Sequence, residues 1–200
     1  MFWFNRLTFC VIAALTLKLA SGFDLKCEES DETFFHYGEY RVCLVKDLVI
    51  TTPNEVVTSV NGDINPSQLI GIDIKDQTMN YFPKGLGKFF PNLMFLRSRK
   101  SHLKTLHKED FKSMSQLEWI AIYGQDIETL DSDLFEYTPK LNLVYLEKNK
   151  IKHVGDGLLR GLKDLNFAYF SDNPCINKEG KTKEEIKSLI LKLEENCSSL

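Results

Sequence analysis

A leucine recurs at every twenty-fourth position of this chain, beginning at residue 69. Further apolar positions follow these leucines at constant offsets of three, five, ten and thirteen residues. A single repeat of this length cannot bury its own apolar edge, so successive repeats must stack against one another. The pattern therefore predicts a solenoid of five coils, which start at Leu69, Leu93, Leu117, Leu141 and Leu165.

Each repeat opens with the spacing LxxLxL, which is typical of a strand with one buried face. Asn149 and Asn173 follow two such strands, and we expect their amides to turn inward and bond backbone groups at the bend. Ser98 interrupts an apolar column, and we expect its hydroxyl to bond a neighbouring carbonyl. A weaker polar ladder is predicted in the earlier coils, which hold Gln77, Ser101 and Gln125 instead.

These residues resemble the leucine-rich repeat family, in the twenty-four-residue type that is common in extracellular proteins. The resemblance covers about residues 69 to 175, and similar repeats occur in Toll-like receptor ectodomains and in short secreted insect proteins. It implies an α/β solenoid in the form of a curved horseshoe. Its concave side would be a parallel β-sheet, and its convex side would consist of turns and short helices.

The repeats over residues 69–174 need a cap before them, because an open end would expose the apolar core. Residues 23–68 are expected to form this N-terminal cap, with a capping strand over residues 40–44. A degenerate first coil is predicted to begin at Val45, which lies one period before Leu69 and repeats the LxxLxL spacing.

Residues 175–200 are expected to form the C-terminal cap, which opens with a segment similar to the family's C-terminal caps. Thr182 and Glu185 form a capping box that predicts a helix over about residues 183–195. Its apolar stripe, which can lie across the last coil, consists of Ile186, Leu189, Ile190 and Leu193.

The first residues are typical of a signal peptide. Arg6 supplies a positive charge, and residues 9–17 form an apolar stretch that is too short to span a bilayer. Small residues then predict cleavage after Gly22. No second apolar run has spanning length, so the mature chain is expected to be secreted and extracellular, without a membrane span.

Loss of residues 1–22 would remove Arg6 and Lys18 and change the formal net charge from −3 to −5. This mildly acidic balance does not favour nucleic-acid binding. Four cysteines remain, an even number that indicates disulfides in an exported chain. Five stacked coils would separate the two cysteine pairs by about 20 Å, whereas bridged Cα atoms lie within about 7 Å. The predicted disulfides are therefore Cys27–Cys43 and Cys175–Cys197.

The variable positions between the core leucines are predicted to point outward from the sheet in columns. Large apolar residues fill one column, and tyrosines occur in the next two. An exposed apolar patch of this kind marks an interaction site. The alternative is that the largest rings lean onto neighbouring loops and are partly buried. The expected partner-binding residues are Phe95, Trp119, Leu143, Phe167, Tyr123, Tyr145 and Tyr169.

The coil over residues 93–116 has a local charge of +4, unlike the rest of the chain. Arg97, Arg99 and Lys100 would lie on or beside the outward face and could bind an acidic protein surface, a sulfated glycan or an anionic lipid head group. The alternative is an ordinary solvated face, balanced by Asp73 and Asp76 on the adjacent coil.

We find no constellation typical of an enzyme, a metal site or a cofactor site in the sequence. The histidines lack neighbours at metal-ligand spacing and are expected to be solvated: His36, His102, His107 and His153. Asn196 begins a formal glycosylation sequon, but its central residue is Cys197, which is assigned to a disulfide.

The sequence thus favours a secreted, non-catalytic protein that binds an extracellular protein partner through the concave face. The family resemblance implies roles such as innate immunity or cell recognition. Two alternatives remain: a glycan- or lipid-binding carrier that uses the basic coil, and a structural protein that self-associates as a homodimer through the aromatic column.

Overall fold

The structure is a computed structural model, and it describes residues 21–33 and 38–198. The predicted signal peptide lies almost wholly outside the described residues. Its last two residues, Ser21 and Gly22, begin the first strand and pair with Glu55 and Val56.

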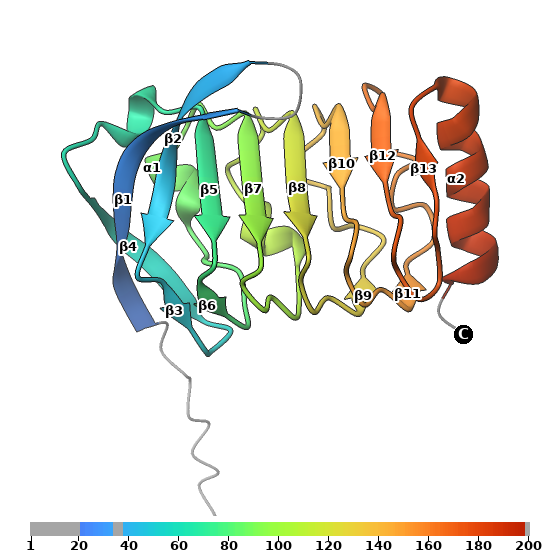
Figure 1. Cartoon of the computed structure of the whole chain (residues 1–200), viewed down its shortest axis with the longest axis horizontal. Coiled ribbons are helices and arrows are strands. Elements are labelled where there is room, and N and C mark those ends of the chain that lie inside the picture. The colour runs from blue at the N-terminus through green and yellow to red at the C-terminus, as the bar shows by residue number, and fades with distance from the viewer. Residues whose placement is uncertain (1–20, 34–37, 199–200) are drawn as a thin grey trace, which may run out of the picture.

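Parallel strands form most of one nine-stranded sheet, in the order β13-β12-β10-β8-β7-β5-β2-β1-β4 (Figure 1). The repeats supply five of them in register, so that the first outward column runs from Gly71 through Phe95, Trp119 and Leu143 to Phe167. The bounds are β1 (Ser21–Thr33), β2 (Glu39–Lys46), β4 (Glu55–Asn61), β5 (Gly71–Lys75), β7 (Phe95–Arg99), β8 (Trp119–Tyr123), β10 (Leu143–Tyr145), β12 (Phe167–Tyr169) and β13 (Glu179–Gly180).

The chain returns behind this sheet through turns, short helices and two small strand pairs. The strand pairs are β3 (Val49–Ile50) with β6 (Thr78–Met79), and β9 (Thr129–Leu130) with β11 (His153–Val154). The short helices of this turn side are η1 (Pro66–Gln68), α1 (Leu86–Phe89) and η2 (Lys108–Phe111).

The main core lies between the sheet and the turn side, and the repeated leucines belong to it. Leu93, Leu117 and Leu141 are fully buried. Phe111 joins successive coils, because its ring centroid lies 5.8 Å from that of Phe82 and 6.3 Å from that of Phe135. Truncating any one of these buried leucines would cost about 2–5 kcal/mol, since the stacked coils cannot collapse into the cavity.

Inward amides satisfy the backbone at each bend, as the sequence predicts for Asn173 and Asn149. Asn173 Nδ2 donates to Leu146 O at 2.9 Å and to Phe170 O at 3.0 Å, and its Oδ1 accepts from Ile151 N at 3.2 Å. Asn149 Nδ2 donates to Leu146 O at 2.9 Å in its own coil and to Ile122 O at 2.9 Å in the preceding coil. Each asparagine therefore joins its own coil to a neighbouring one.

Gln125 extends the ladder into the earlier coils. Its Oε1 accepts from Ser101 N at 3.0 Å and from Leu103 N at 3.1 Å, and its Nε2 donates to Ser98 Oγ at 3.1 Å. Ser98 is therefore bonded, but its partner is a side-chain amide rather than the expected carbonyl. Gln77 continues the series through a 2.6 Å bond from Leu48 N to its Oε1.

A left-handed residue turns the chain one to three residues after the end of β2 and of each repeat strand. It recurs once per coil at the same place in the repeat, with φ between 49° and 61°. Only one of these positions is glycine, so the others hold a conformation that costs an L-residue roughly 1–2 kcal/mol. They are Asp47, Asp76, Lys100, Gly124, Lys148 and Asp172.

The first coil follows a different register from the predicted one, which begins at Val45. Val42 lies beside Gly71, and Ile50 lies beside Met79, so the offset is 29 residues rather than 24. The extra length has a physical reason: β4 leaves the path of the coil to pair with β1. The capping strand is confirmed as part of β2.

Both ends are closed as predicted. The disulfides Cys27–Cys43 and Cys175–Cys197 are formed. The cap helix α2 (Lys183–Asn196) begins after Thr182, whose side chain accepts from the backbone of Glu185, and it buries Ile186, Leu189 and Leu193. β13 ends the sheet beside it, antiparallel to β12.

Asp110 is a carboxyl group that the sequence did not single out. It is buried in η2, where its Oδ2 accepts from His107 N at 2.8 Å. Burial raises the pKa of Asp110 from its ordinary 3.8 to about 6, against the opposing effects of the His107 bond and of Lys84. The fold therefore favours the neutral acid.

We expect Lys148→Gly to stabilise the fold, because glycine relieves the left-handed strain at φ 53°. The expected gain is about 0.5–1 kcal/mol after the extra unfolded-state entropy of glycine is subtracted. Gly124→Ala should lose a similar amount, since φ there is 61° and no atom lies near the new Cβ. Urea denaturation of the disulfide-intact chain measures both. Lys163→Gly is the control, because this exposed lysine has no positive φ and should lose stability.

We also expect Asp110→Asn to flatten the pH dependence of stability. The raised pKa makes the contribution of Asp110 complete below about pH 4 and lost as the pH rises through about 6. The variant should match the parent near pH 4 and exceed it at pH 7 by up to about 3 kcal/mol. Chemical denaturation at pH 4, 5, 6 and 7 measures the difference between the two curves. A parallel pair of curves would show that Asp110 is not the titrating group.

Candidate functional site

The outward face of the sheet carries a second apolar cluster, separate from the main core. Val42 of β2, Phe95 of β7, Trp119 of β8 and Leu143 of β10 form it, and Gly71 of β5 lies between Val42 and Phe95. The exposed fractions are 3% for Phe95, 9% for Trp119 and 2% for Leu143. The predicted column is therefore correctly placed, but the expectation that these three side chains form an exposed ridge is wrong.

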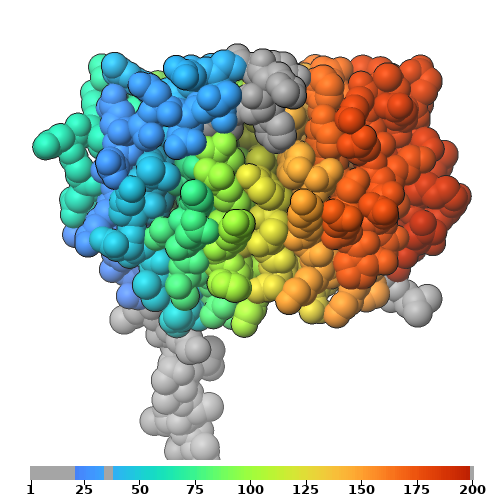
Figure 2. Space-filling view, viewed as in Figure 1, coloured from blue at the N-terminus to red at the C-terminus, as the bar shows by residue number. Residues whose placement is uncertain are grey.

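The β1–β2 hairpin explains this burial. Its far end leans across the starts of β5 and β7, on the face that Figures 1 and 2 show. The ring of Tyr40 lies 4.5 Å from that of Phe95 and meets Trp119 edge-on at 6.4 Å. Sequence periodicity missed Tyr40, because this residue precedes the repeats and no spacing relates it to them.

Acidic and basic side chains anchor the same hairpin. Arg97 donates to Glu32 Oε2 at 2.6 Å, to Thr33 O at 3.1 Å and to Asp73 Oδ2 at 2.7 Å. Arg99 donates to the same Asp73 oxygen at 3.0 Å. Asp73 is fully buried, so two guanidinium groups compensate one buried carboxylate.

This network corrects the predicted anion site. Desolvation acts to lower the pKa of Arg97, but the hydrogen bonds and charges of Asp73 and Glu32 outweigh it and raise the pKa. Arg97 and Arg99 are therefore structural cations whose charges are already matched. Lys100 is exposed at its left-handed turn and does not join them on the sheet face. The structure thus favours the balanced-face alternative for the two arginines.

Three tyrosines form a continuous row beside the buried cluster. The ring centroid of Tyr145 lies 5.2 Å from that of Tyr123 and 5.1 Å from that of Tyr169. Tyr145 donates to Glu147 Oε2 at 2.5 Å, and Lys181 lies 5.6 Å from the Tyr169 ring centre. All three tyrosines, with Phe167, are half-buried. We call Tyr123, Tyr145 and Tyr169 the tyrosine row.

The hydroxyl of Tyr145 is held in its neutral form. Burial and the hydrogen bond to Glu147 raise the pKa of Tyr145. The row therefore offers neutral ring faces and hydroxyl groups at neutral pH, with the charges of Glu147 and Lys181 at its borders. Lys181 lies in the turn that connects β13 to α2, which is outside the repeats.

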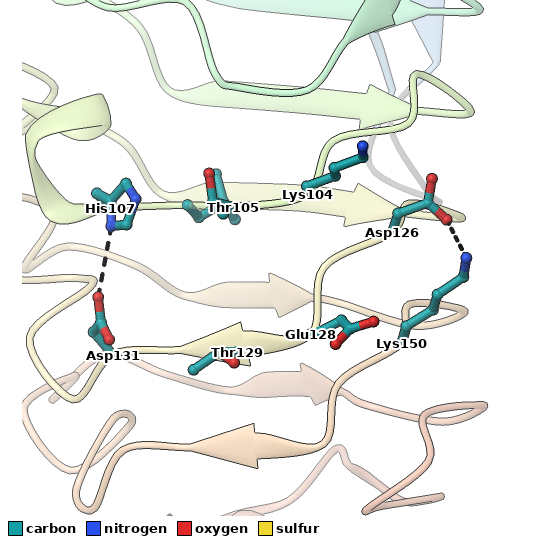
Figure 3. A pocket seen from close by; sticks show the side chains of 9 residues that line it. Lys104, Thr105, His107, Asp126, Glu128, Thr129, Asp131 and Lys150 are labelled. Carbon is teal, nitrogen blue, oxygen red and sulfur yellow. Dashed lines mark ion pairs between the residues drawn. The ribbon is translucent and has the colours of Figure 1, made fainter. Parts of the chain in front are cut away.

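A polar groove lies on the turn side, away from the sheet face (Figure 3). Two histidines near it are exposed as predicted, and each also contacts a carboxylate of the next coil. His102 Nδ1 lies 3.2 Å from Asp126, and His107 Nδ1 lies 3.6 Å from Asp131. Within residues 21–33 and 38–198, no group of three or more acidic, histidine or cysteine side chains is arranged to hold a metal ion.

Comparisons with known proteins place these repeats in context. No family model matches the sequence. Prolargin, a leucine-rich repeat proteoglycan, is 32% identical in its Bos taurus form over 73 residues, which are 36% of this chain and 19% of prolargin. The Mus musculus form is 26% identical over 78 residues, covering 39% of this chain and 21% of prolargin.

A solved structure shows the same fold. A chain in the structure of the Toll–Spatzle complex from Drosophila superposes with a TM-score of 0.52 over 62% of this chain, at 23% identity. This chain is a leucine-rich repeat protein. The chain spans about a fifth of the length of the prolargins that it matches and 17% of the superposed chain. None of the helices in the described leucine-rich repeat structure is long and apolar enough to cross a membrane.

The buried ion network makes a stability prediction. Arg97→Met should destabilise the fold by about 2–4 kcal/mol, because Asp73 keeps only Arg99 as a partner in a buried site. The double variant Asp73→Leu with Arg97→Met should recover part of this loss, giving a coupling energy of about 1–3 kcal/mol. Denaturation of the parent, both single variants and the double variant measures it. Additive single losses would show that the two side chains do not stabilise each other.

Proposed function

We propose that this protein is a secreted, non-catalytic leucine-rich repeat module that binds an extracellular protein partner. Its contact surface is the outward face of the sheet, which the family resemblance makes the concave side of a horseshoe. The tyrosine row carries this proposal, because it places three half-buried rings in line at spacings of 5.2 and 5.1 Å.

Tyrosine suits protein recognition for a physical reason. Its large ring supplies contact area, and its hydroxyl bonds polar groups, while few rotamers are lost on binding. The buried cluster of Phe95, Trp119 and Leu143 supports the row from the side. Such support preorganises the rings and lowers the entropy cost of association. Of the predicted partner-binding residues, the buried three therefore hold the tyrosine row in place, and the half-buried Phe167 lies beside the row.

Secretion is supported by two independent features. The disulfides Cys27–Cys43 and Cys175–Cys197 are typical of chains that fold in an oxidising compartment. The first residues have the charge and apolar pattern of a signal peptide. We propose an extracellular location on these grounds.

The superposed structure supports a protein as the partner. That structure is of the Toll–Spatzle complex, a molecular hub in Drosophila development and innate immunity. By analogy of fold, we propose a role in innate immunity or cell recognition for this chain. The glycan or anionic-lipid alternative loses its main support, since Arg97 and Arg99 already pair with acidic side chains.

Capture from native extracellular fluid tests the proposed surface. The bait is the mature chain with a photo-crosslinking residue at Phe167, and the test variant adds Tyr145→Ala and Tyr169→Ala. We expect crosslinked proteins to be lost from the variant, because removing interface tyrosines costs about 1–2 kcal/mol each or more. Quantitative mass spectrometry of the crosslinked bands is the measurement.

Tyr137→Ala is the matched control, because Tyr137 is also half-buried but lies in the turns behind the sheet. It should retain every crosslinked protein. Equal capture by the Tyr145/Tyr169 variant would contradict the proposal. Light scattering of the parent and the variant separates the homodimer alternative, in which the parent would have twice the mass and the variant would be a monomer.

A further inference from the structure

The backbone ladder on the turn side is interrupted at one junction between adjacent coils. Lys104 N donates to Asn80 O at 3.0 Å, and Lys152 N donates to Glu128 O at 2.9 Å. The equivalent bond between the coils that start at Leu93 and Leu117 would run from Glu128 N to Lys104 O. No such bond occurs between these described residues, although the bonds on either side of the junction are formed.

A second left-handed residue explains the interruption. His102 has φ 62° and follows Lys100, which is the usual left-handed position of that coil. The residues equivalent to His102 in the two neighbouring coils, Thr78 and Asp126, have no positive φ. Asp126 N still donates to Leu103 O at 2.9 Å, so the coils touch up to this point and diverge beyond it.

The divergence leaves a groove between residues 104–107 and residues 128–131, with a volume of about 500 Å³. This volume is within the range of ligand sites, roughly 300–1,000 Å³. Figure 3 shows the His107–Asp131 contact across one end and the 2.6 Å pair of Lys150 with Asp126 at the other.

One wall of this groove is an open strand edge. Glu128 O accepts from His153 N at 3.3 Å, and Leu130 O accepts from Gly155 N at 2.8 Å, so both carbonyls face β11. Backbone groups of successive strand residues point to opposite sides. The N–H and C=O of Thr129 therefore face the groove, and no bond joins them to the described residues of the opposite wall.

The opposite wall has an unused polar group as well. Thr105 lines the groove, and its hydroxyl oxygen is buried without a hydrogen-bond partner. Leaving a buried hydroxyl unpaired costs about 1–3 kcal/mol. An occupant could bond the groups of Thr129 directly, and the Thr105 hydroxyl after a rotation of its side chain.

We propose that this groove binds an extended peptide segment of a partner protein, which adds to the open edge of β9. An extended peptide presents alternating N–H and C=O groups, which are the complement of an unpaired strand edge. This site lies on the turn side and does not involve the tyrosine row.

The lining charges specify the peptide further. Three carboxylates, Asp126, Glu128 and Asp131, line the groove with two ammonium groups, Lys104 and Lys150, and Lys152 pairs with Glu128 at 2.9 Å from outside the lining. The hydrogen bond from Lys150 lowers the pKa of Asp126, so this carboxylate stays ionised at neutral pH. The lining itself carries one more carboxylate than ammonium groups, and on this basis we expect the groove to favour a peptide with basic side chains over an acidic one.

Nuclear magnetic resonance of the isotope-labelled mature chain tests the site. The probe is a blocked hexapeptide of alternating threonine and lysine, and the comparison peptides replace lysine by glutamate or methylate alternate amide nitrogens. We expect saturable shifts of the Thr129 and Leu106 amides with the lysine peptide. Binding should weaken roughly tenfold or more for the methylated peptide, since each lost hydrogen bond is worth about 1 kcal/mol.

Thr129→Pro is the matching protein variant, because it removes the N–H that faces the groove and keeps the carbonyls that bond β11. It should abolish the shifts, whereas Thr129→Val, which keeps the N–H, should preserve them. The Gly155 amide reports whether β9 and β11 remain paired in the proline variant. If that pairing is lost, the methylated peptide decides on the unmodified chain.

Three outcomes would overturn this proposal. They are equal binding of the methylated peptide, preference for the glutamate peptide, and shifts confined to the tyrosine row. Tyr145→Ala should leave groove binding unchanged, so failure of the groove and failure of the sheet-face function are distinguishable.

Discussion

Backbone groups at each bend must find partners inside the core, because the chain turns there away from water. Asn149, Asn173 and Gln125 meet this constraint by bonding two coils at once. Their bonds keep neighbouring strands in register, and the register in turn aligns the outward columns. Both the buried aromatic cluster and the tyrosine row depend on this alignment, and the groove opens at the one junction where His102 diverts the chain.

Local periodicity was enough to predict the repeats, the disulfides and the cap helix. Each of these depends on spacings within one coil or on the distance that stacked coils impose. The sequence also placed Phe95 and Trp119 in the correct column. It could not predict their burial, because the cover comes from Tyr40, which lies outside the repeats and contacts them only through the path of the hairpin.

The charge pattern located the basic coil, but it did not show which acidic residues pair with its arginines. The basic coil contains Arg97 as expected, yet its partner Glu32 lies 65 residues earlier, and only the folded hairpin brings them together. The groove was missed for a similar reason. Histidine adopts a positive φ more often than most residues but still rarely, so the residue type of His102 does not predict it. The resulting gap involves missing backbone bonds rather than a recognisable motif.

The final strand of the sheet runs against the direction of the five repeat strands. A new coil duplicated downstream of Gly180 would meet an antiparallel neighbour and the flank of α2, so it could not continue the same stacking. During evolution the array could therefore grow or shrink by whole units only upstream of β13. A change in the number of coils would therefore alter the outward face of the sheet and leave the C-terminal cap intact.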